Sequence, residues 1–495
     1  MTLAVPAATA SSRQAELFEP GSNADALGDT FCIDNDAQSR RAHGITLTPP
    51  WLVGRMLDEV QGRAFQTIVD CGAGTGRFAI AAALRFPRAR VVAVEQHPEL
   101  VALLRQRVRE SGLAQRVSVI EGDFREVHLP LQGRSLFIGN PPYVRHHDIA
   151  PDWKAWYASN MAAHGLGASQ LAGLHAHFMV RAGELMRPGD ALCFVTSAEW
   201  LDNGYGQALR GLFSATPRLA LRGLWLADAA QPVFADALVS SVVVHAECGE
   251  PATPVRTGML SEQKLQTLRQ LDPVQLRDAG RWSPWCRPTL AAVATGIELG
   301  ELFRVTRGQV TGLNAAWVLK GEHFGLPLSL SVAAVTRAKE IIDGVVLTQT
   351  GAAQLKRVVS LPADLDTLPA DQRDSALRFL AHARSLGADQ SYIARHRKPW
   401  YAVGMRAPPA AFVSYMGRRP PVFCANPWRA SFINIAHGLY PRQAMDGGTL
   451  QRVLQHLNTT TDLHAGRMYG GGMAKFEPSD VARLRVPAEV LEAAT

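Results

Sequence analysis

The segment Asn140-Pro141-Pro142-Tyr143 has the residue types needed to bind and activate a flat amine. The Asn140 carboxamide oxygen and a main-chain carbonyl of the prolines can each accept one hydrogen from an exocyclic NH2 group, which frees the lone pair of the nitrogen. The prolines fix φ and remove two N–H donors, so the backbone presents only acceptors. The Tyr143 ring can stack on the base that carries the amine. Asn-Pro-Pro also suits an ordinary strand-ending turn, so the segment alone leaves both interpretations open.

A strand, a glycine-rich turn and a helix are predicted upstream of this segment. Residues 67–70 form a short, mainly apolar stretch that ends at Asp70. Three glycines follow, Gly72, Gly74 and Gly76, and residues 78–84 then have a helical pattern. This order opens a nucleotide-binding α/β domain. The dinucleotide fingerprint would need glycine at position 77, where Arg77 stands. The loop instead resembles the S-adenosylmethionine loop of class I methyltransferases.

Three further strands are predicted to end at polar residues. Residues 90–94 end at Glu95, whose carboxylate can accept hydrogen bonds from both hydroxyls of a ribose. Residues 117–120 lead to Asp123, which can accept from an adenine amino group while Phe124 packs on the ring, and residues 136–139 end at Asn140. Ligands bind at the carboxyl edge of a parallel sheet, so these residues are expected to meet there.

Two other positions complete the predicted site. Thr48 precedes Pro49-Pro50 and a helical pattern, which is typical of a helix N-cap, and such a terminus can hold a carboxylate. Residues 174–186 predict an amphipathic helix, and residues 191–196 and 239–244 predict buried strands. Phe234 lies just before the last of these strands. From the residues alone we interpret it as a core aromatic.

Positive charge is concentrated in the second half of the chain. Residues 1–245 contain 22 Lys and Arg against 23 Asp and Glu, a balance of −1; the remaining 29 against 21 give +8, and together these make the net +7. A polyanion such as a nucleic acid suits this asymmetry. Three clusters combine basic and aromatic residues, which suits phosphate and base contact: Arg395, Arg397 and Lys398 near Trp400; Arg418 and Arg419; Arg467 and Tyr469.

Composition also limits the compartment and the domain plan. The six cysteines are scattered without a C-x-x-C pair, so we expect reduced thiols and no metal site. Neither a signal peptide nor a membrane span is predicted, so a cytoplasmic protein is expected. We divide the chain into a flexible arm (1–42), a catalytic domain (43–248), a proline-containing linker (249–300) and a recognition domain (301–495).

Taken together, these motifs resemble the DNA N6-adenine methyltransferases of the gamma arrangement, the TaqI-like enzymes. The resemblance covers residues 43–245 by motif and 300–490 more loosely. It implies an α/β class I S-adenosylmethionine-dependent fold with a C-terminal α+β target-recognition domain. His43 to Pro50 resembles the first cofactor motif, Asp70 to Gly76 the glycine motif, and Asn140 to Tyr143 the catalytic tetrapeptide. By position, the resemblance makes Phe234 the second aromatic that stacks on a flipped adenine.

The resemblance also implies partners. We expect duplex DNA as substrate, a monomeric enzyme of the restriction-modification type and a separately encoded restriction endonuclease. Alternatives stay open at this point, because the same tetrapeptide occurs in enzymes that methylate RNA bases or protein glutamine side chains. A bifunctional nuclease-methyltransferase and a non-catalytic DNA-binding protein are two further alternatives. A downstream half of about 250 residues favours the DNA enzyme.

Overall fold

The computed structural model describes residues 46–228, 231, 233–234, 240–249, 254–288, 296–319, 324–469 and 473–492. Residues up to 290 form one compact unit, and most residues from 291 onward form a second. The arm expected at 1–42 and the motif residues His43 to Ile45 lie outside the described residues. Among the helices that are described, none is both long enough and apolar enough to span a bilayer.

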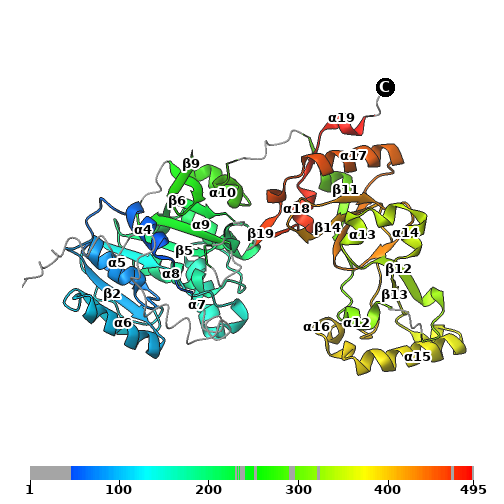
Figure 1. Ribbon diagram of the computed structural model, residues 1–495, viewed down its shortest axis with the longest axis horizontal. Helices are drawn as coiled ribbons and strands as arrows, with labels where there is room; N and C mark the ends of the chain where they lie inside the picture. The colour runs from blue at the N-terminus through cyan, green and yellow to red at the C-terminus, as the bar shows by residue number, and fades with distance from the viewer. Residues whose placement is uncertain are drawn as a thin grey trace, which may run out of the picture. The chain divides into compact units, whose positions relative to one another are not determined.

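Within its described residues, the first unit is built on one sheet of nine strands in the order β3-β2-β1-β4-β5-β7-β6-β8-β9. Figure 1 labels several of these strands together with the helices around them. The strands of the first unit are β1 (Thr67–Cys71), β2 (Arg90–Glu95), β3 (Val117–Glu121), β4 (Ser135–Gly139), β5 (Ala191–Ser197), β6 (Ala220–Ala227), β7 (Ser241–Glu247), β8 (Val255–Leu260) and β9 (Leu265–Leu271). Its helices are α4 (Pro50–Glu59), α5 (Arg77–Arg85), α6 (Pro98–Glu110), α7 (Pro151–Ala163), α8 (Leu174–Leu185), α9 (Gln207–Ala215) and α10 (Pro273–Asp278). Strands β1 to β5 pair in parallel, whereas β7 runs antiparallel to β5 and β6.

The parallel half of the sheet is buried on both faces. Ile68 and Leu136 belong to a core with side chains of α4, α5 and α6, whereas their neighbours Val69 and Phe137 belong to a second core with α7, α8 and α9. Successive side chains on a strand point to opposite faces, so one apolar run serves both cores. This arrangement confirms the predicted class I methyltransferase sheet and fixes the direction in which its strand ends point.

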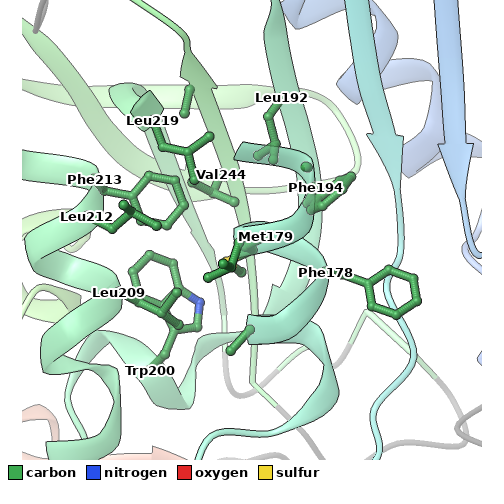
Figure 2. Close-up of a cluster of buried hydrophobic side chains, with 14 of the residues drawn as sticks. Phe178, Met179, Leu192, Phe194, Trp200, Leu209, Leu212, Phe213, Leu219 and Val244 are labelled. Carbon is green, nitrogen blue, oxygen red and sulfur yellow. The ribbon is translucent and has the colours of Figure 1, made fainter. Parts of the chain in front are cut away.

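The core beneath α8 and α9 is rich in aromatic residues (Figure 2). Trp200 and Phe213 lie with their ring centroids 5.4 Å apart, and both are fully buried. Figure 2 shows that Phe178 points from α8 away from these side chains. Phe178 still belongs to this core cluster, but its ring packs against Phe124, with the centroids 5.1 Å apart.

Most elements predicted for the first unit are present with shifts of one or two residues. Strands β1 to β5 and helices α5 and α8 are confirmed. The buried strand expected at 239–244 is β7, which begins at Ser241; Val239 lies outside the described residues. Strand β6 and helices α6, α7 and α9 were not predicted.

The linker expected at 249–300 is wrong over much of its length. Strands β8 and β9 extend the catalytic sheet, and α10 follows them. Two of the prolines that indicated a linker are helix starts: Pro273 is the first residue of α10, behind an Asp272 capping box, and Pro284 lies in the first turn of a short 3-10 helix. Proline is favoured there because its missing N–H would have no helical partner anyway.

The described part of the second unit contains four smaller sheets with helices packed on them (Figure 1). The sheets have the orders β11-β18-β14-β16, β13-β12-β17, β15-β20-β19 and β10-β21. Their strands are β10 (Ile297–Glu298), β11 (Phe303–Arg307), β12 (Ser331–Val335), β13 (Arg357–Val359), β14 (Ala411–Ser414), β15 (Met416–Gly417), β16 (Phe423–Ala425), β17 (Ser431–Phe432), β18 (Ala436–Pro441), β19 (Arg467–Tyr469), β20 (Met473–Lys475) and β21 (Arg485–Val486). The helices are α11 (Leu299–Leu302), α12 (Asn314–Trp317), α13 (Lys339–Ile342), α14 (Gln349–Ala353), α15 (Ala370–Ser385), α16 (Tyr392–Arg395), α17 (Gly447–Thr460), α18 (Pro478–Ala482) and α19 (Ala488–Leu491).

Candidate active site

One pocket gathers most of the predicted site residues at the carboxyl edge of β1 to β4. It encloses about 550 Å³, counting space that is open to solvent. Its lining consists of Thr46, Leu47, Gly72, Gly74, Val94, Glu95, Gln96, Leu100, Gly122, Asp123, Phe124, Asn140, Pro142 and Phe178. The parallel pairing of β3, β2, β1 and β4 brings these segments together, because all four strands end at the same edge.

The glycine loop and Glu95 are joined directly. The Gly74 N–H donates to Glu95 Oε2 over 2.7 Å, while Glu95 Oε1 accepts the backbone N–H groups of Gln96 and His97, each over 2.9 Å. Gly72 and Gly74 have φ angles of +82° and +54°, a region that favours glycine. The Glu95 carboxylate is therefore held rigidly at the pocket wall.

Two residues of the glycine motif lie behind the pocket rather than in it. Asp70 is fully buried, and its Oδ2 accepts the Ala79 N–H over 2.9 Å, which ties the loop to α5. Desolvation by burial raises the pKa of Asp70 to about 8, and the Glu95 charge adds to this effect. Gly76 has a φ of +86°, which favours glycine, and a Cβ there would also meet the Leu104 side chain. Both residues shape the loop without lining the pocket.

Asp123 and Phe124 follow β3 and also line the pocket. The Phe124 ring packs against Phe178 with centroids 5.1 Å apart. Both Asp123 oxygens accept from the Arg125 side chain, with Nε to Oδ1 at 3.0 Å and Nη2 to Oδ2 at 2.5 Å. This wall therefore combines an apolar platform with a carboxylate held by a buried arginine.

Asn140 lines the pocket, and of the two polar atoms of its side chain the nitrogen is hydrogen-bonded and the oxygen is not. Its Nδ2 donates to the Thr46 carbonyl over 3.2 Å. Its Oδ1 is buried and has no hydrogen-bond partner in the part of the chain that the structure describes. A carbonyl can only accept, so Thr46 must face the NH2 group, and this contact fixes the orientation of the carboxamide. Asn140 thus offers a buried, unused acceptor.

Tyr143 is the last residue of Asn140-Pro141-Pro142-Tyr143, which we call the NPPY segment, and it lies next to Phe234, although 90 residues separate the two in the sequence. Their ring centroids are 6.2 Å apart at an interplanar angle of 64°. Burial raises the pKa of the Tyr143 phenol, which therefore stays neutral. Phe234 is 3% exposed and packs in the core with Tyr143, which agrees with the core interpretation. Neither residue is among those that line the pocket.

The predicted N-cap at Thr48 is wrong. Helix α4 starts at Pro50, the preceding residue is Pro49, and no side chain caps it. Thr48 is buried, and its carbonyl accepts from Arg77 Nη1 over 2.8 Å, so this segment is fastened to the start of α5. Thr46 and Leu47, which belong to the stretch His43 to Pro50 that resembles the first cofactor motif, reach the pocket instead.

The three basic clusters of the second unit differ in what surrounds them. Arg395 and Lys398 are exposed, whereas Arg397 donates to the carbonyl oxygens of Val310 and Thr311. The other two clusters share one sheet: Arg418 and Arg419 are exposed and directly follow β15, and Arg467 and Tyr469 are the first and last residues of β19. Arg467 Nε donates to Asp480 over 3.1 Å. Arg397 and Arg467 are therefore engaged within the protein.

Phe178, Leu100 and Arg125 were missed because no local pattern marks them. Phe178 and Leu100 lie on helices, where an apolar residue is normally core. Arg125 follows Asp123 by two residues, and its contact with that carboxylate depends on the turn after β3. When elements that are distant in the sequence form a site together, the residue pattern around each single site residue gives little indication of its role.

The residues at the pocket fit S-adenosylmethionine. A Cβ at Gly74 would meet no protein atom within 4 Å, and this position lines the pocket, so glycine keeps that space free for a ligand. Glu95 suits ribose hydroxyls, and the Phe124 and Phe178 rings suit the faces of an adenine. The unpartnered Oδ1 of Asn140 lies at the same pocket.

Comparison with known proteins agrees with this fit. Residues 68–156 match a methyltransferase domain, residues 121–220 the Eco57I restriction-modification methylase, and residues 289–495 the C-terminal domain of the type II methyltransferase M.Eco57I. The type II methyltransferase M.XamI of Xanthomonas campestris pv. amaranthicola is 44% identical over 452 residues, which cover 90% of this chain and 85% of that protein.

Two other similarities are partial or structural. A release factor glutamine methyltransferase of Moorella thermoacetica is 30% identical over 166 residues, covering 33% of this chain and 56% of that protein. The type IIL restriction-modification enzyme MmeI, solved in complex with DNA, has a TM-score of 0.62 at 12% identity, covering 92% of this chain and 70% of that chain. The glutamine enzyme shares only part of the chain. This protein therefore belongs to the type II DNA methyltransferases of restriction-modification systems and uses S-adenosylmethionine as its cofactor.

Proposed function

We propose that this enzyme methylates N6 of an adenine that has been rotated out of duplex DNA. The observation that carries the proposal is the buried Oδ1 of Asn140, which has no partner among the described residues and is aligned by the Thr46 carbonyl. An acceptor of this kind suits a group with hydrogens to donate, such as an exocyclic amine. Bound S-adenosylmethionine supplies an electrophilic methyl group.

The NPPY segment would act on the amine by hydrogen bonding and positioning. Asn140 Oδ1 accepts one hydrogen of the N6 amine, and the Pro141 carbonyl accepts the other. Both contacts orient the nitrogen lone pair and stabilise positive charge as it develops on the nitrogen. The amine becomes more acidic once it is methylated, so its proton can leave to water.

Tyr143 and Phe234 would hold the extruded base. Rotating a base out of the duplex costs a few kcal/mol, and stacking on aromatic side chains offsets part of that cost. The two rings now touch edge to face, with their centroids 6.2 Å apart. We expect the Phe234 ring to shift when a base enters between them.

A cytosine ring carbon is a poorer candidate for the methyl acceptor. Methylation at carbon needs a nucleophile that first adds to the ring, and a cysteine thiolate is the suitable group. Every cysteine in the described part of the chain is buried, and burial raises the pKa of Cys71 and Cys193, the two nearest in sequence to the NPPY segment. N4 of cytosine remains the second candidate, because it too is an exocyclic amine.

We infer a division of labour between the two units. The first holds cofactor and target base, and the second holds the duplex, because residues 291–495 contain 23 Lys and Arg against 16 Asp and Glu, an excess positive charge of +7. A monomer acting in the cytoplasm beside a separately encoded endonuclease completes the proposal.

Base rotation is tested with DNA of the methylated sequence, which single-molecule sequencing of DNA from an expressing host identifies. A duplex with 2-aminopurine at the target position should become more fluorescent when the wild-type protein binds. Phe234→Ala should reduce that increase. An unchanged signal with tightly bound wild-type protein would contradict base rotation.

A further inference from the structure

Arg125 is a largely buried cation that contacts Asp123 from outside the cofactor pocket. Its side chain is 10% exposed and does not line the pocket, whereas Asp123 does. The guanidinium grips both Asp123 oxygens: Nε lies 3.0 Å from Oδ1 and 3.1 Å from Oδ2, and Nη2 lies 2.5 Å from Oδ2. A two-pronged contact of this type fixes the plane of a carboxylate as well as its position.

The guanidinium, whose edge binds Asp123, lies with one face over an aromatic ring. Arg125 Cζ lies 4.0 Å from the centroid of the Trp153 ring on α7, and Trp153 contacts Trp156 with centroids 5.4 Å apart. Arg125 Nη1 is buried and has no hydrogen-bond partner within the described ranges. Arg125 therefore has one strong acceptor, Asp123, and a flat support that limits its other orientations.

His177, a histidine near the Arg125–Asp123 pair, adds no positive charge to it. His177 stacks on Tyr157 with centroids 4.8 Å apart, and desolvation together with the Arg125 charge lowers its pKa to about 3. His177 is therefore neutral at physiological pH. The carboxylate and the guanidinium form a partly buried pair, and removal of either partner would leave the other charge without its main partner.

We propose that Arg125 is a positioning residue for cofactor recognition, which holds the Asp123 carboxylate so that a remaining lone pair faces the adenine amino group of S-adenosylmethionine. Three N–H groups of Arg125 donate to this carboxylate: the backbone N–H, over 2.9 Å to Oδ1, and the side-chain Nε and Nη2. A carboxylate has about four acceptor positions, so it can keep these contacts and still accept from one amine. Without the Arg125 side chain, only the backbone N–H of residue 125, which donates to Asp123 Oδ1 over 2.9 Å, would still hold this carboxylate, and the carboxylate could rotate about that contact. The enzyme would then lose its preference for an amino group over a keto group at that place on the ring.

This inference rests on the cofactor and on its contact with Asp123, and it is independent of which DNA base is methylated. Calorimetry would measure the affinity of the full chain for S-adenosylmethionine and for an analogue with hypoxanthine in place of adenine. Wild-type protein should prefer the adenine form, because the keto oxygen of hypoxanthine would face a carboxylate. Arg125→Ala should weaken S-adenosylmethionine binding about tenfold and reduce the preference.

A double-mutant cycle separates positioning from an independent contact. If Arg125 acts through Asp123, Asp123→Ala with Arg125→Ala should bind no more weakly than Asp123→Ala alone. Arg125→Ala should raise KM for the cofactor and leave kcat at saturating cofactor near the wild-type value, because binding alone is affected. Additive losses, or an unchanged base preference in Arg125→Ala, would overturn the proposal.

Two further variants serve as controls. Arg105 pairs with Glu121 at 3.5 Å near the end of the same strand, but both side chains are nearly half exposed. Arg105→Ala should therefore leave cofactor affinity and preference unchanged. If Arg125→Ala does not fold, Arg125→Lys keeps the charge over Trp153 without the two-pronged contact. Partial affinity with a reduced preference is expected for it, and wild-type preference would contradict the proposal.

Discussion

Asn140 Nδ2 donates a hydrogen bond to the carbonyl oxygen of Thr46 over 3.2 Å, across 94 positions of sequence. This one contact decides which end of the carboxamide is left for a substrate. Thr46 belongs to the segment that runs into α4, so the start of the described chain orients a side chain at the end of β4. The acceptor role of Asn140 is therefore a consequence of the fold as well as of the residue type.

Replacing Asn140 by alanine should abolish most methyl transfer and leave cofactor binding nearly intact. The side chain would act on the amine, and loss of one such polar contact typically lowers kcat by about 100-fold or more. The measurement is single-turnover transfer of a labelled methyl group to DNA, with cofactor affinity from calorimetry. Wild-type turnover in Asn140→Ala would contradict the assigned role.

Glu95→Ala should weaken S-adenosylmethionine binding by roughly 1–3 kcal/mol, the scale for losing hydrogen bonds to a charged acceptor. It should also loosen the glycine loop, because Glu95 accepts the Gly74 N–H. Glu95→Gln keeps one acceptor oxygen, so its affinity for S-adenosylmethionine should lie between that of the wild type and that of Glu95→Ala. If calorimetry gave one affinity for all three proteins, Glu95 would not contact the cofactor.

Much of this site could be predicted because each parallel strand ends in a recognisable residue. The glycines after β1, and Glu95, Asp123 and Asn140 after their strands, needed only the rule that parallel strands end together. The contacts of Arg125 and Thr46 could not be predicted, since they depend on turns that the residue pattern does not specify.

The error over β8 and β9 has a different cause. β9 is a half-exposed edge strand with polar residues such as Gln266 and Arg269, and edge strands lack the apolar run that marked β1 and β4. Its composition resembles a linker, and only its pairing with β8 distinguishes it.

The Arg395 cluster should divide by function. Arg395 and Lys398 are exposed, so Arg395→Ala and Lys398→Ala should each reduce the salt slope of DNA binding by about 0.9 if the residue contacts a phosphate. Arg397→Ala should mainly lower thermal stability, because its guanidinium binds the carbonyls of Val310 and Thr311. An unaltered slope in the Arg395 and Lys398 variants would move the DNA surface to Arg418 and Arg419.

Stability should fall as the solution becomes acidic, partly through His175. Desolvation lowers the pKa of this buried imidazole from 6.5 to about 4. Below pH 6.5 the unfolded chain takes up a proton that the folded chain refuses, so stability is lost between pH 6.5 and about 4. By pH 5 the loss is roughly 2 kcal/mol.

Denaturant unfolding at pH 7 and pH 5 measures this effect. His175→Asn removes the titrating group, so its unfolding free energy should change less between the two pH values than that of the wild type. The comparison is of pH dependence, so a general destabilisation of the variant does not affect it. Equal pH dependence in both proteins would show that His175 titrates normally in the folded state.

Identification of the methylated nucleoside tests the central claim most directly. Purified enzyme would be incubated with duplex DNA and S-adenosylmethionine that carries a deuterated methyl group, and the DNA would be digested to nucleosides for mass spectrometry. The proposed chemistry predicts labelled N6-methyladenine from the wild type and almost none from Asn140→Ala. Labelled N4-methylcytosine or 5-methylcytosine as the product would contradict it.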